Sequence, residues 1–203
     1  MSLPSVLPNI ATLPWILADG GALDVDLCPD CWERNAHLER YELATRAFPR
    51  MHVMDFGCGV GYGSEMLSKV GCVVVGLDVS EQALGLANQR RKGCFVRPGD
   101  PRLDVPFGAI VAFEVIEHLD DPVSFFEWAA RRARHILVSV PVIPTVAANP
   151  HHRTDFTPGS FRRLVSDQFE IQSEWPQCFP LQSDPVILIV HATNRDPGNM
   201  IKG

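Results

Sequence analysis

Apolar runs alternate with amphipathic segments through the middle of the chain, and this alternation constrains the fold more than any other feature of the sequence. The runs predicted as buried strands lie at 51–56, 72–77, 94–97, 108–113 and 135–140. The segments predicted as helices lie at 62–69, 80–91 and 122–134, with Ser80 and Asp121 as N-caps. Strands that alternate with helices need right-handed crossovers, so we predict a doubly wound, mainly parallel α/β sheet with helices on both faces.

The two ends of the chain have a different rhythm. A helix expected at 158–166, preceded by Thr157, is followed by two strands in a row at 169–175 and 186–191. Consecutive strands pair as a hairpin, so the predicted seven-stranded sheet ends with an antiparallel strand. Ahead of the first strand, a helix at 33–47 is expected against the sheet or over its ligand crevice, and the residues after Asn194 form a frayed tail.

The composition is that of an ordinary globular protein of one domain, with 203 residues, 46% of them apolar and 21% charged. The 24 Asp and Glu outnumber the 18 Lys and Arg, and the formal charge of -6 disfavours nucleic acid as a partner. No apolar stretch is long enough for a membrane span. The first 23 residues carry one charge, Asp19, but no Lys or Arg comes before Arg34, which favours a docked arm over a signal peptide.

Three of the six cysteines fall in or beside predicted core strands and a glycine-rich loop: Cys58, Cys72 and Cys94. Burial suits reduced thiols, so we expect a reducing, cytoplasmic setting. Cys28 and Cys31 have the spacing of half a zinc site, but no second pair of this kind follows and His37 would bring the set only to three ligands.

The turn after the first predicted strand is rich in glycine, since residues 55–63 read Asp-Phe-Gly-Cys-Gly-Val-Gly-Tyr-Gly. Glycines there let the backbone approach a ligand without Cβ clashes. Asp78 ends the second strand, 21 positions after Gly57, where a carboxylate can bind both hydroxyls of a ribose. The alternative to a cofactor site is a tight turn with a helix-capping Asp. The spacing between the glycines and Asp78, together with the flanking strands, favours the cofactor site.

The loop departs from the dinucleotide pattern G-x-G-x-x-G, because Tyr62 or Ser64 stands where its last glycine belongs. Asp55, in the strand just before the loop, would also repel a pyrophosphate. We therefore expect a nucleoside cofactor without phosphates, and a dehydrogenase is disfavoured.

Three successive motifs resemble those of class I S-adenosylmethionine-dependent methyltransferases: 55–63, Gly-Leu-Asp-Val-Ser at 76–80, and Phe-Glu-Val-Ile-Glu-His-Leu-Asp-Asp-Pro at 113–122. The resemblance extends over about 37–190 and is greatest to the type 11 and ubiquinone-biosynthesis-like branch, whose members often carry a segment like 37–44. It implies a Rossmann-like methyltransferase fold. The chain would comprise an arm and a helix over the crevice at 1–50, a cofactor-binding methyltransferase domain at 51–194 and a tail at 195–203.

The resemblance also implies which residues contact S-adenosylmethionine: Arg40, Tyr41, Asp55, Gly57, Cys58, Gly59, Asp78, Val79, Asp100, Pro101 and Glu114. In this family the loop glycines approach the methionine part, with Asp55 near its amino group. Asp78 would bind the ribose, and Val79 and Asp100 the adenine. Pro101 stands where the family commonly has a small or aliphatic residue, so the adenine contact is expected to shift.

Histidines mark the expected acceptor side, since methyl transfer to oxygen needs a base or a metal that acidifies the hydroxyl. Glu114, Glu117 and His118 would share one face if the chain turned helical after the fourth strand, and such a set could bind Mg²⁺, Mn²⁺ or Zn²⁺, as its resemblance to ubiquinone-type and small-RNA-terminal methyltransferases implies. We favour the metal-free interpretation because the sequence fixes no fourth ligand. His152, and more weakly His151, are candidates for the base or for that fourth ligand.

We therefore predict an S-adenosylmethionine-dependent methyltransferase that acts on an oxygen, or a nitrogen, of a small-molecule acceptor, with His118, His152 and His151 as catalytic candidates. A histidine base predicts a rate that rises through pH 6–7. Two alternatives stay open: a cofactor-binding protein of the same fold without turnover, and an RNA ribose methyltransferase. Trp15 and Trp32 either pack in the core or roof a pocket for an apolar or aromatic acceptor.

Overall fold

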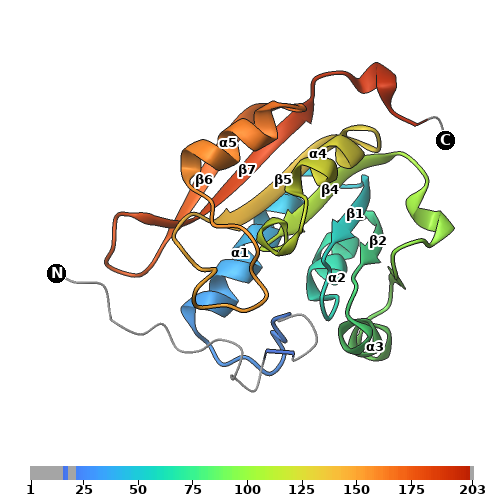
Figure 1. The fold of residues 1–203 in the computed structure, drawn as a ribbon. Helices are drawn as coiled ribbons and strands as arrows, with labels where there is room; N and C mark the ends of the chain where they lie inside the picture. The colour runs from blue at the N-terminus through green and yellow to red at the C-terminus, as the bar shows by residue number, and fades with distance from the viewer. Residues whose placement is uncertain (1–15, 18–21, 202–203) are drawn as a thin grey trace.

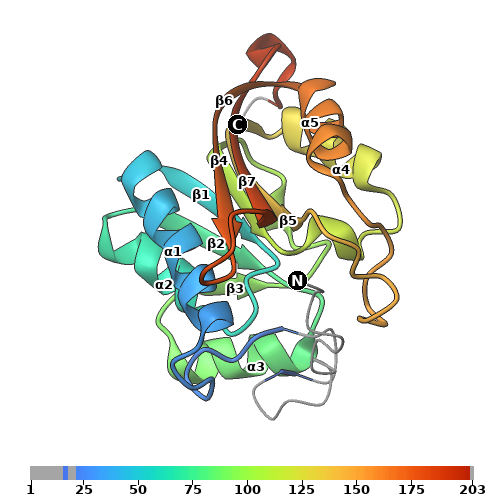
Figure 2. The ribbon, with the colours of Figure 1, turned by 90° about the vertical axis from the view of Figure 1, so that its left-hand side faces the viewer.

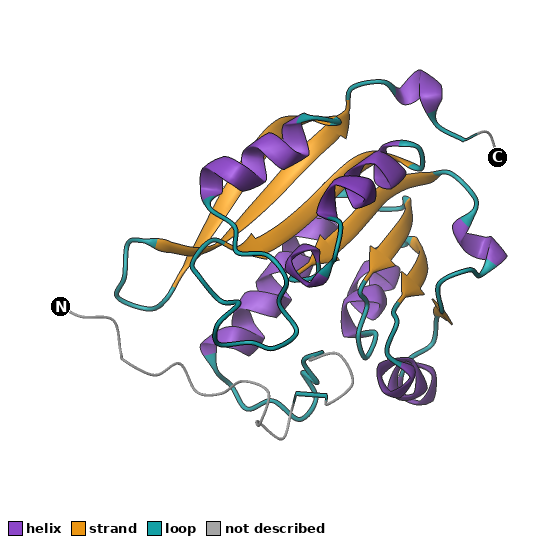
Figure 3. Ribbon diagram, in the orientation of Figure 1, coloured by secondary structure: helices purple, strands orange, loops and turns teal. Residues whose placement is uncertain are grey.

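The computed structural model describes residues 16–17 and 22–201. Strands and helices alternate along most of this part of the chain (Figure 1, Figure 3). The strands are β1 (His52–Phe56), β2 (Val73–Leu77), β3 (Cys94–Val96), β4 (Phe107–Phe113), β5 (Ala133–Pro141), β6 (Phe169–Cys178) and β7 (Pro185–Asn194). The helices are α1 (Trp32–Ala47), α2 (Tyr62–Lys69), α3 (Glu81–Arg90), α4 (Pro122–Ala130) and α5 (Pro158–Ser166). Short 3-10 turns lie at Pro101–Leu103, Ile116–His118 and Pro197–Asn199.

The strands form one seven-stranded sheet in the order β3-β2-β1-β4-β5-β7-β6. In its parallel part, Val53 of β1 lies opposite Val74 of β2 and Ala109 of β4. β7 runs antiparallel to both of its neighbours, β5 and β6. The predicted doubly wound sheet with a C-terminal antiparallel strand is therefore confirmed. The strand order reverses between β1 and β4, and such switch points are where open α/β sheets bind ligands, beyond the carboxyl ends of the strands.

Helices cover both faces of the sheet, with α1 and α2 on one side and α4 and α5 on the other (Figure 2). Successive strand residues point to opposite faces, so Val53 packs in the core under α1 and α2 while Met54 packs in the core under α4 and α5. Both side chains are fully buried. The middle of the sheet is thus buried on both faces, and the loops at the carboxyl ends of its strands extend from this packed core.

The helix starts predicted from capping residues are confirmed. Ser80, Asp121 and Thr157 each accept a hydrogen bond from the backbone N–H three residues later, at 2.9, 3.1 and 3.1 Å. Pro122 and Pro158 follow two of these caps in the first helical turn, where a missing N–H costs nothing.

Several element ends differ from the prediction, and the largest differences are at the ends of α4, β6 and β7, the last of which runs on past His191 to Asn194. α4 ends at Ala130 and not at 134, because Ala133 already pairs with Phe107 as the first residue of β5. β6 runs on past Trp175 to Cys178.

The stretch 195–201 is also less free than a frayed tail. The Nε atom of Arg195 donates to the carbonyl oxygens of Ser166 and Phe169, and the N–H of Ile201 donates to the carbonyl of Arg131 at 2.8 Å. These bonds fasten the segment to the ends of the helical layer.

At the other end, the predicted arm, with Trp15, lies outside the described residues except for a bridge between Ile16 and Leu23. The helix expected at 33–47 is α1. No helix of the described chain is both long and apolar enough to cross a bilayer.

Candidate active site

A cavity of about 1030 Å³ lies at the carboxyl ends of the parallel strands, bordered by α1 and by the loop after β5. Its wall contains most of the predicted site residues: Arg40, Tyr41, Gly57, Cys58, Gly59, Asp78, Val79, Asp100, Glu114, His118, His151 and His152. Asp55 and Pro101 are not part of this wall. One cavity therefore brings together the two groups that the sequence separates into cofactor and acceptor residues.

The glycine loop can take its shape only with glycines at two positions on the cavity wall. Gly57 and Gly59 have φ values of 76° and 52°, in the left-handed region that side chains rarely adopt. A Cβ atom on Gly57 would also lie 2.3 Å from Cγ2 of Val115. The backbone thus approaches Val115, in the turn after β4, more closely than any other residue type allows.

Asp78 fastens this loop from the end of β2. Its Oδ2 accepts the N–H of Gly59 at 2.8 Å, and its Oδ1 accepts the N–H of Ser80 at 2.9 Å. A carboxylate offers about four acceptor positions, so both oxygens retain capacity for ligand hydroxyls. Beside it Val79 is 72% exposed and lines the cavity, so it offers an apolar surface there.

Asp55 lies behind the wall, within β1. It is 1% exposed, and its oxygens accept hydrogen bonds from the hydroxyls of Tyr41 and Ser64 at 2.8 and 2.6 Å. Burial raises the pKa of Asp55 to about 6, and these two hydrogen bonds oppose the increase only in part. Asp55 therefore ties α1 and α2 to β1, while its contact with a cofactor amino group stays a prediction.

The raised pKa of Asp55 predicts a pH-dependent stability. The folded protein keeps the Asp55 proton up to about pH 6, whereas the unfolded chain releases it near pH 3.8. Between these values the folded state binds more protons, so the free energy of unfolding falls as the pH rises, by about 3 kcal/mol for a difference of this size. Asp55→Asn should flatten this part of the profile in urea unfolding between pH 4 and 7. An unchanged slope would contradict the assignment.

Arg40 reaches the cavity from α1. It is fully buried, yet its Nε and Nη2 atoms have no hydrogen-bond partner in the described structure. Its Nη1 donates to Oε1 of Gln177 at 2.7 Å. Buried guanidinium groups are costly without acceptors. Arg40 lines the cavity, and its charge also acts on the buried carboxyl groups of Glu114 and Glu117, so its unpartnered N–H groups suit an anionic partner.

Glu114 does not join the predicted helical face with Glu117 and His118. It has a φ of 56°, and the chain then forms a 3-10 turn at Ile116–His118 in place of an α-helix. The hydroxyl of Ser139 in β5 donates to Oε1 of Glu114 at 2.8 Å. Burial raises the pKa of Glu114. The left-handed residue thus turns Glu114 toward β5 and leaves it outside the set that Glu117 and His118 form, although its charge helps to raise the pKa of Glu117.

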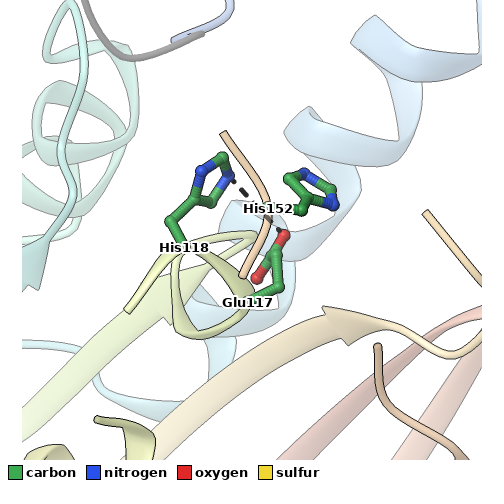
Figure 4. A group of neighbouring side chains, drawn as sticks. All are labelled: Glu117, His118 and His152. Carbon is green, nitrogen blue, oxygen red and sulfur yellow. Dashed lines mark ion pairs between the residues drawn. The ribbon is translucent and has the colours of Figure 1, made fainter. Parts of the chain in front are cut away.

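Glu117 and His118 instead meet His152, which comes from the loop after β5 (Figure 4). One ligand atom from each of the three lies within 4.8 Å of the others, the one set in the described chain that could hold a metal ion. The rings of His118 and His152 meet edge to face with centroids 4.6 Å apart. Burial lowers the pKa of His118 to about 4 and also lowers that of His152, so both imidazoles are neutral at pH 7.

Glu117 is the most isolated polar group of this cluster. It is 1% exposed, Oε1 lies 3.9 Å from Nε2 of His118, and neither oxygen has a hydrogen-bond partner among the described residues. Burial raises the pKa of Glu117 well above its usual range. A carboxyl group in this state takes up a proton or a cation.

His152 is oriented by its own loop. Its Nδ1 lies 2.7 Å from the hydroxyl oxygen of Thr145. The carbonyl of Glu117 accepts the N–H groups of Arg153 and Thr154 at 2.7 and 3.2 Å, which pins the loop to the turn after β4. When Nδ1–H donates to Thr145, Nε2 keeps a free lone pair that can accept a proton.

Aromatic and aliphatic side chains form another part of the cavity wall. The rings of Trp32 and Phe179 lie with centroids 4.6 Å apart, and the indole N–H of Trp32 donates to the carbonyl of Cys178 at 2.9 Å. Ile143 and Ile187 extend the same wall. Trp32 therefore both packs and lines the cavity, and the sequence missed its partners because they lie near the distant C-terminal hairpin.

Cys28 and Cys31 lie at the start of α1 with their Sγ atoms 3.3 Å apart, and both are free thiols. No third metal-ligating side chain joins them in the part of the chain that is described. The pair therefore does not extend to a zinc site there.

A family model described as a methyltransferase domain matches residues 33–178. The chain is 30% identical to a protein of Mycolicibacterium smegmatis that is named as an S-adenosylmethionine-dependent methyltransferase, over 84% of this chain and 68% of that protein. It is also 30% identical to a ubiquinone biosynthesis O-methyltransferase of Paramagnetospirillum magneticum, over 49% of this chain and 43% of that protein. The chain thus spans between about two fifths and two thirds of the length of these relatives.

Solved structures share the fold. Magnesium protoporphyrin IX methyltransferase of Synechocystis PCC 6803 with bound S-adenosylmethionine aligns with a TM-score of 0.67 at 18% identity, over 84% of this chain and 88% of that one. The N-methyltransferase NodS of Bradyrhizobium japonicum WM9, in complex with S-adenosylhomocysteine, aligns with a TM-score of 0.65 at 18% identity, over 84% of this chain and 91% of that one.

Proposed function

The chain belongs to the S-adenosylmethionine-dependent methyltransferases, and from that premise we propose that it methylates an oxygen of a small-molecule acceptor bound beside Glu117, His118 and His152. The observation that carries this proposal is a single cavity with a nucleoside-type half and a half that holds two neutral imidazoles. Transfer to nitrogen is the neighbouring reaction, for which a proton acceptor is less needed.

The residues of the first half fit S-adenosylmethionine. Gly57 and Gly59 line the cavity with backbone alone, Asp78 retains acceptor capacity for the ribose, and Val79 offers an apolar surface to the adenine. The two unpartnered N–H groups of Arg40 match the carboxylate of the methionine part.

S-adenosylmethionine supplies an electrophilic methyl group when it is bound. The task of the chain is then to align the acceptor, exclude water and take up a proton. The wall around Trp32 and Phe179 excludes water and suits an apolar or aromatic body. His152, oriented by Thr145, would take the acceptor proton at Nε2, with His118 packed against its ring. His151 lines the same half and stays a weaker candidate.

The lowered histidine pKa values revise the pH dependence expected from the sequence. An ordinary imidazole would make the rate rise through pH 6–7. His118, with a pKa of about 4, and His152, with a lowered pKa, are already neutral in that range. We therefore expect the rate at saturating cofactor to change by less than about twofold between pH 6.5 and 8.5. A tenfold rise between pH 6 and 7 would contradict this expectation.

A second candidate mechanism places a divalent ion at Glu117, His118 and His152. The observation in its favour is the pair of buried, unpartnered oxygens of Glu117. Such an ion would lower the pKa of an acceptor hydroxyl. Glu114 is directed to Ser139 and would not belong to the ligand set.

Methyl-donor consumption tests the proposal, with the protein screened against phenols, sugars, carboxylates, amines and RNA. We expect turnover with a hydroxyl compound of low molecular mass. Tight binding of S-adenosylhomocysteine without turnover of any acceptor would favour the binding-only alternative. Turnover of RNA alone would favour the ribose methyltransferase.

A further inference from the structure

One hydrogen bond fixes the orientation of the Arg40 guanidinium. The N–H groups at Nε and Nη2 are free, while Nη1 donates to Oε1 of Gln177 at 2.7 Å. Gln177 belongs to β6 and stands 137 positions further along the chain. Its side chain therefore decides which way the free edge of the guanidinium points.

Gln177 is itself firmly held. It is 6% exposed, and its Nε2 donates to the carbonyl of Ala36 at 3.0 Å and to Oε2 of Glu39 at 2.7 Å. Because both acceptors of the NH₂ group lie on α1, the amide must present its oxygen to Arg40. Neither a flipped amide nor a shorter side chain would satisfy all these partners.

The edge strand β6 brings this amide to α1. Side chains two positions apart share a face of a strand, and Trp175 on the same face also packs against the core under α1. The carbonyl of the next residue, Cys178, accepts the indole N–H of Trp32 at 2.9 Å. Hydrogen bonds of Gln177 and Cys178 thus connect the hairpin of β6 and β7 to α1, the helix that contains Arg40.

We propose that Gln177 is a positioning residue for cofactor recognition, because its neutral amide aims Arg40 at the cofactor carboxylate without neutralising the positive charge. The inference rests on the proposed role of Arg40. A carboxylate at position 177 would hold the guanidinium equally well but would compete for its charge. An amide orients Arg40 and adds no further negative charge beside it, whereas the charge of Arg40 already acts on Glu114 and Glu117.

The experiment compares two ligands that differ only in the carboxylate: S-adenosylmethionine and decarboxylated S-adenosylmethionine. Calorimetry on the full chain without acceptor gives the ratio of their dissociation constants. We expect Gln177→Met to weaken binding of the first about tenfold and to leave the second within about twofold. Gln172→Met is the matched control. Gln172 is an exposed residue of the same strand, and its Nε2 donates to the carbonyl of Glu170, two residues earlier.

Two further variants separate the possible failures. Arg40→Met should remove the preference for the carboxylate-bearing ligand, and if it does not, the proposed Arg40 contact and this inference both fail. If Arg40→Met removes the preference but Gln177→Met does not, the Arg40 contact stands and the positioning role is overturned. Equal weakening of both ligands by Gln177→Met would also overturn it, as a purely structural effect. Should that variant not fold, Gln177→Glu is expected to lower the same preference, and an unchanged preference there overturns the proposal.

Discussion

Asp78→Ala is expected to weaken binding of S-adenosylhomocysteine by about 1–3 kcal/mol, a loss of roughly 5- to 150-fold in affinity. The carboxylate accepts the N–H groups of Gly59 and Ser80, so its removal costs the glycine loop two hydrogen bonds. It also removes the acceptor that the ribose hydroxyls are proposed to use. Both effects act on the cofactor half, and isothermal calorimetry measures their sum.

Asp104→Ala provides the matched control. Asp104 borders the same cavity, but its carboxylate is 70% exposed and is paired with Arg132 at 3.3 Å. Surface pairs of this kind contribute little, so we expect a change of less than about twofold. Circular dichroism establishes that each variant is folded. An unchanged dissociation constant in folded Asp78→Ala would refute the ribose-binding role.

Local sequence patterns predict most of the elements because each start and end has a nearby chemical cause. α2 begins at Tyr62 directly after the left-handed Gly61 and ends at Lys69, as the sequence predicts. Ser80 starts α3 by accepting the N–H of Ala83. Glycine freedom and capping hydrogen bonds act over three or four residues, so they are legible without knowledge of the fold.

Strand and helix ends that depend on pairing within the sheet cannot be predicted from local sequence in this way. Pro176 lacks an N–H, so the sequence predicts that the strand stops at Trp175. β6 is an edge strand, where a missing donor is tolerated, and Pro176 pairs opposite Leu188. Likewise Ala133 reads as the end of a charged helix, although pairing with Phe107 makes it the start of β5.

The two halves of the site differ in the same respect. The cofactor half is predictable because one loop and one strand end carry its geometry, as Gly57 and Asp78 illustrate. The acceptor half depends on side chains from distant segments. The spacing of Glu114 and Glu117 indicates a shared helical face, but the left-handed backbone of Glu114 turns its side chain toward Ser139 instead. Arg40 is the exception in the cofactor half, because its hydrogen bond to Gln177, 137 positions away, has no sequence signal.

Removal of the His152 imidazole is expected to have the largest effect on catalysis. If Nε2 takes the acceptor proton, His152→Phe should lower kcat by about 100- to 10,000-fold while the affinity for S-adenosylhomocysteine stays unchanged. His135→Phe is the control, because His135 is a half-buried histidine of β5 whose pKa is likewise lowered by burial but which is not on the cavity wall. Equal loss in both variants would assign the effect to folding.

Glu117 then decides between direct proton transfer and a metal ion. Without a metal, burial raises the pKa of Glu117 well above its usual range and so favours the protonated carboxyl group, which glutamine of the same size should replace with little change. We expect Glu117→Gln and chelator-treated protein both to retain the rate within about threefold, as a metal-free mechanism requires. A metal ligand must instead be ionised, so the same substitution would abolish binding of the ion. A rate lost with chelator and restored by Mg²⁺, Mn²⁺ or Zn²⁺, together with stoichiometric metal that is absent from Glu117→Gln, would establish the metal mechanism in place of the histidine base.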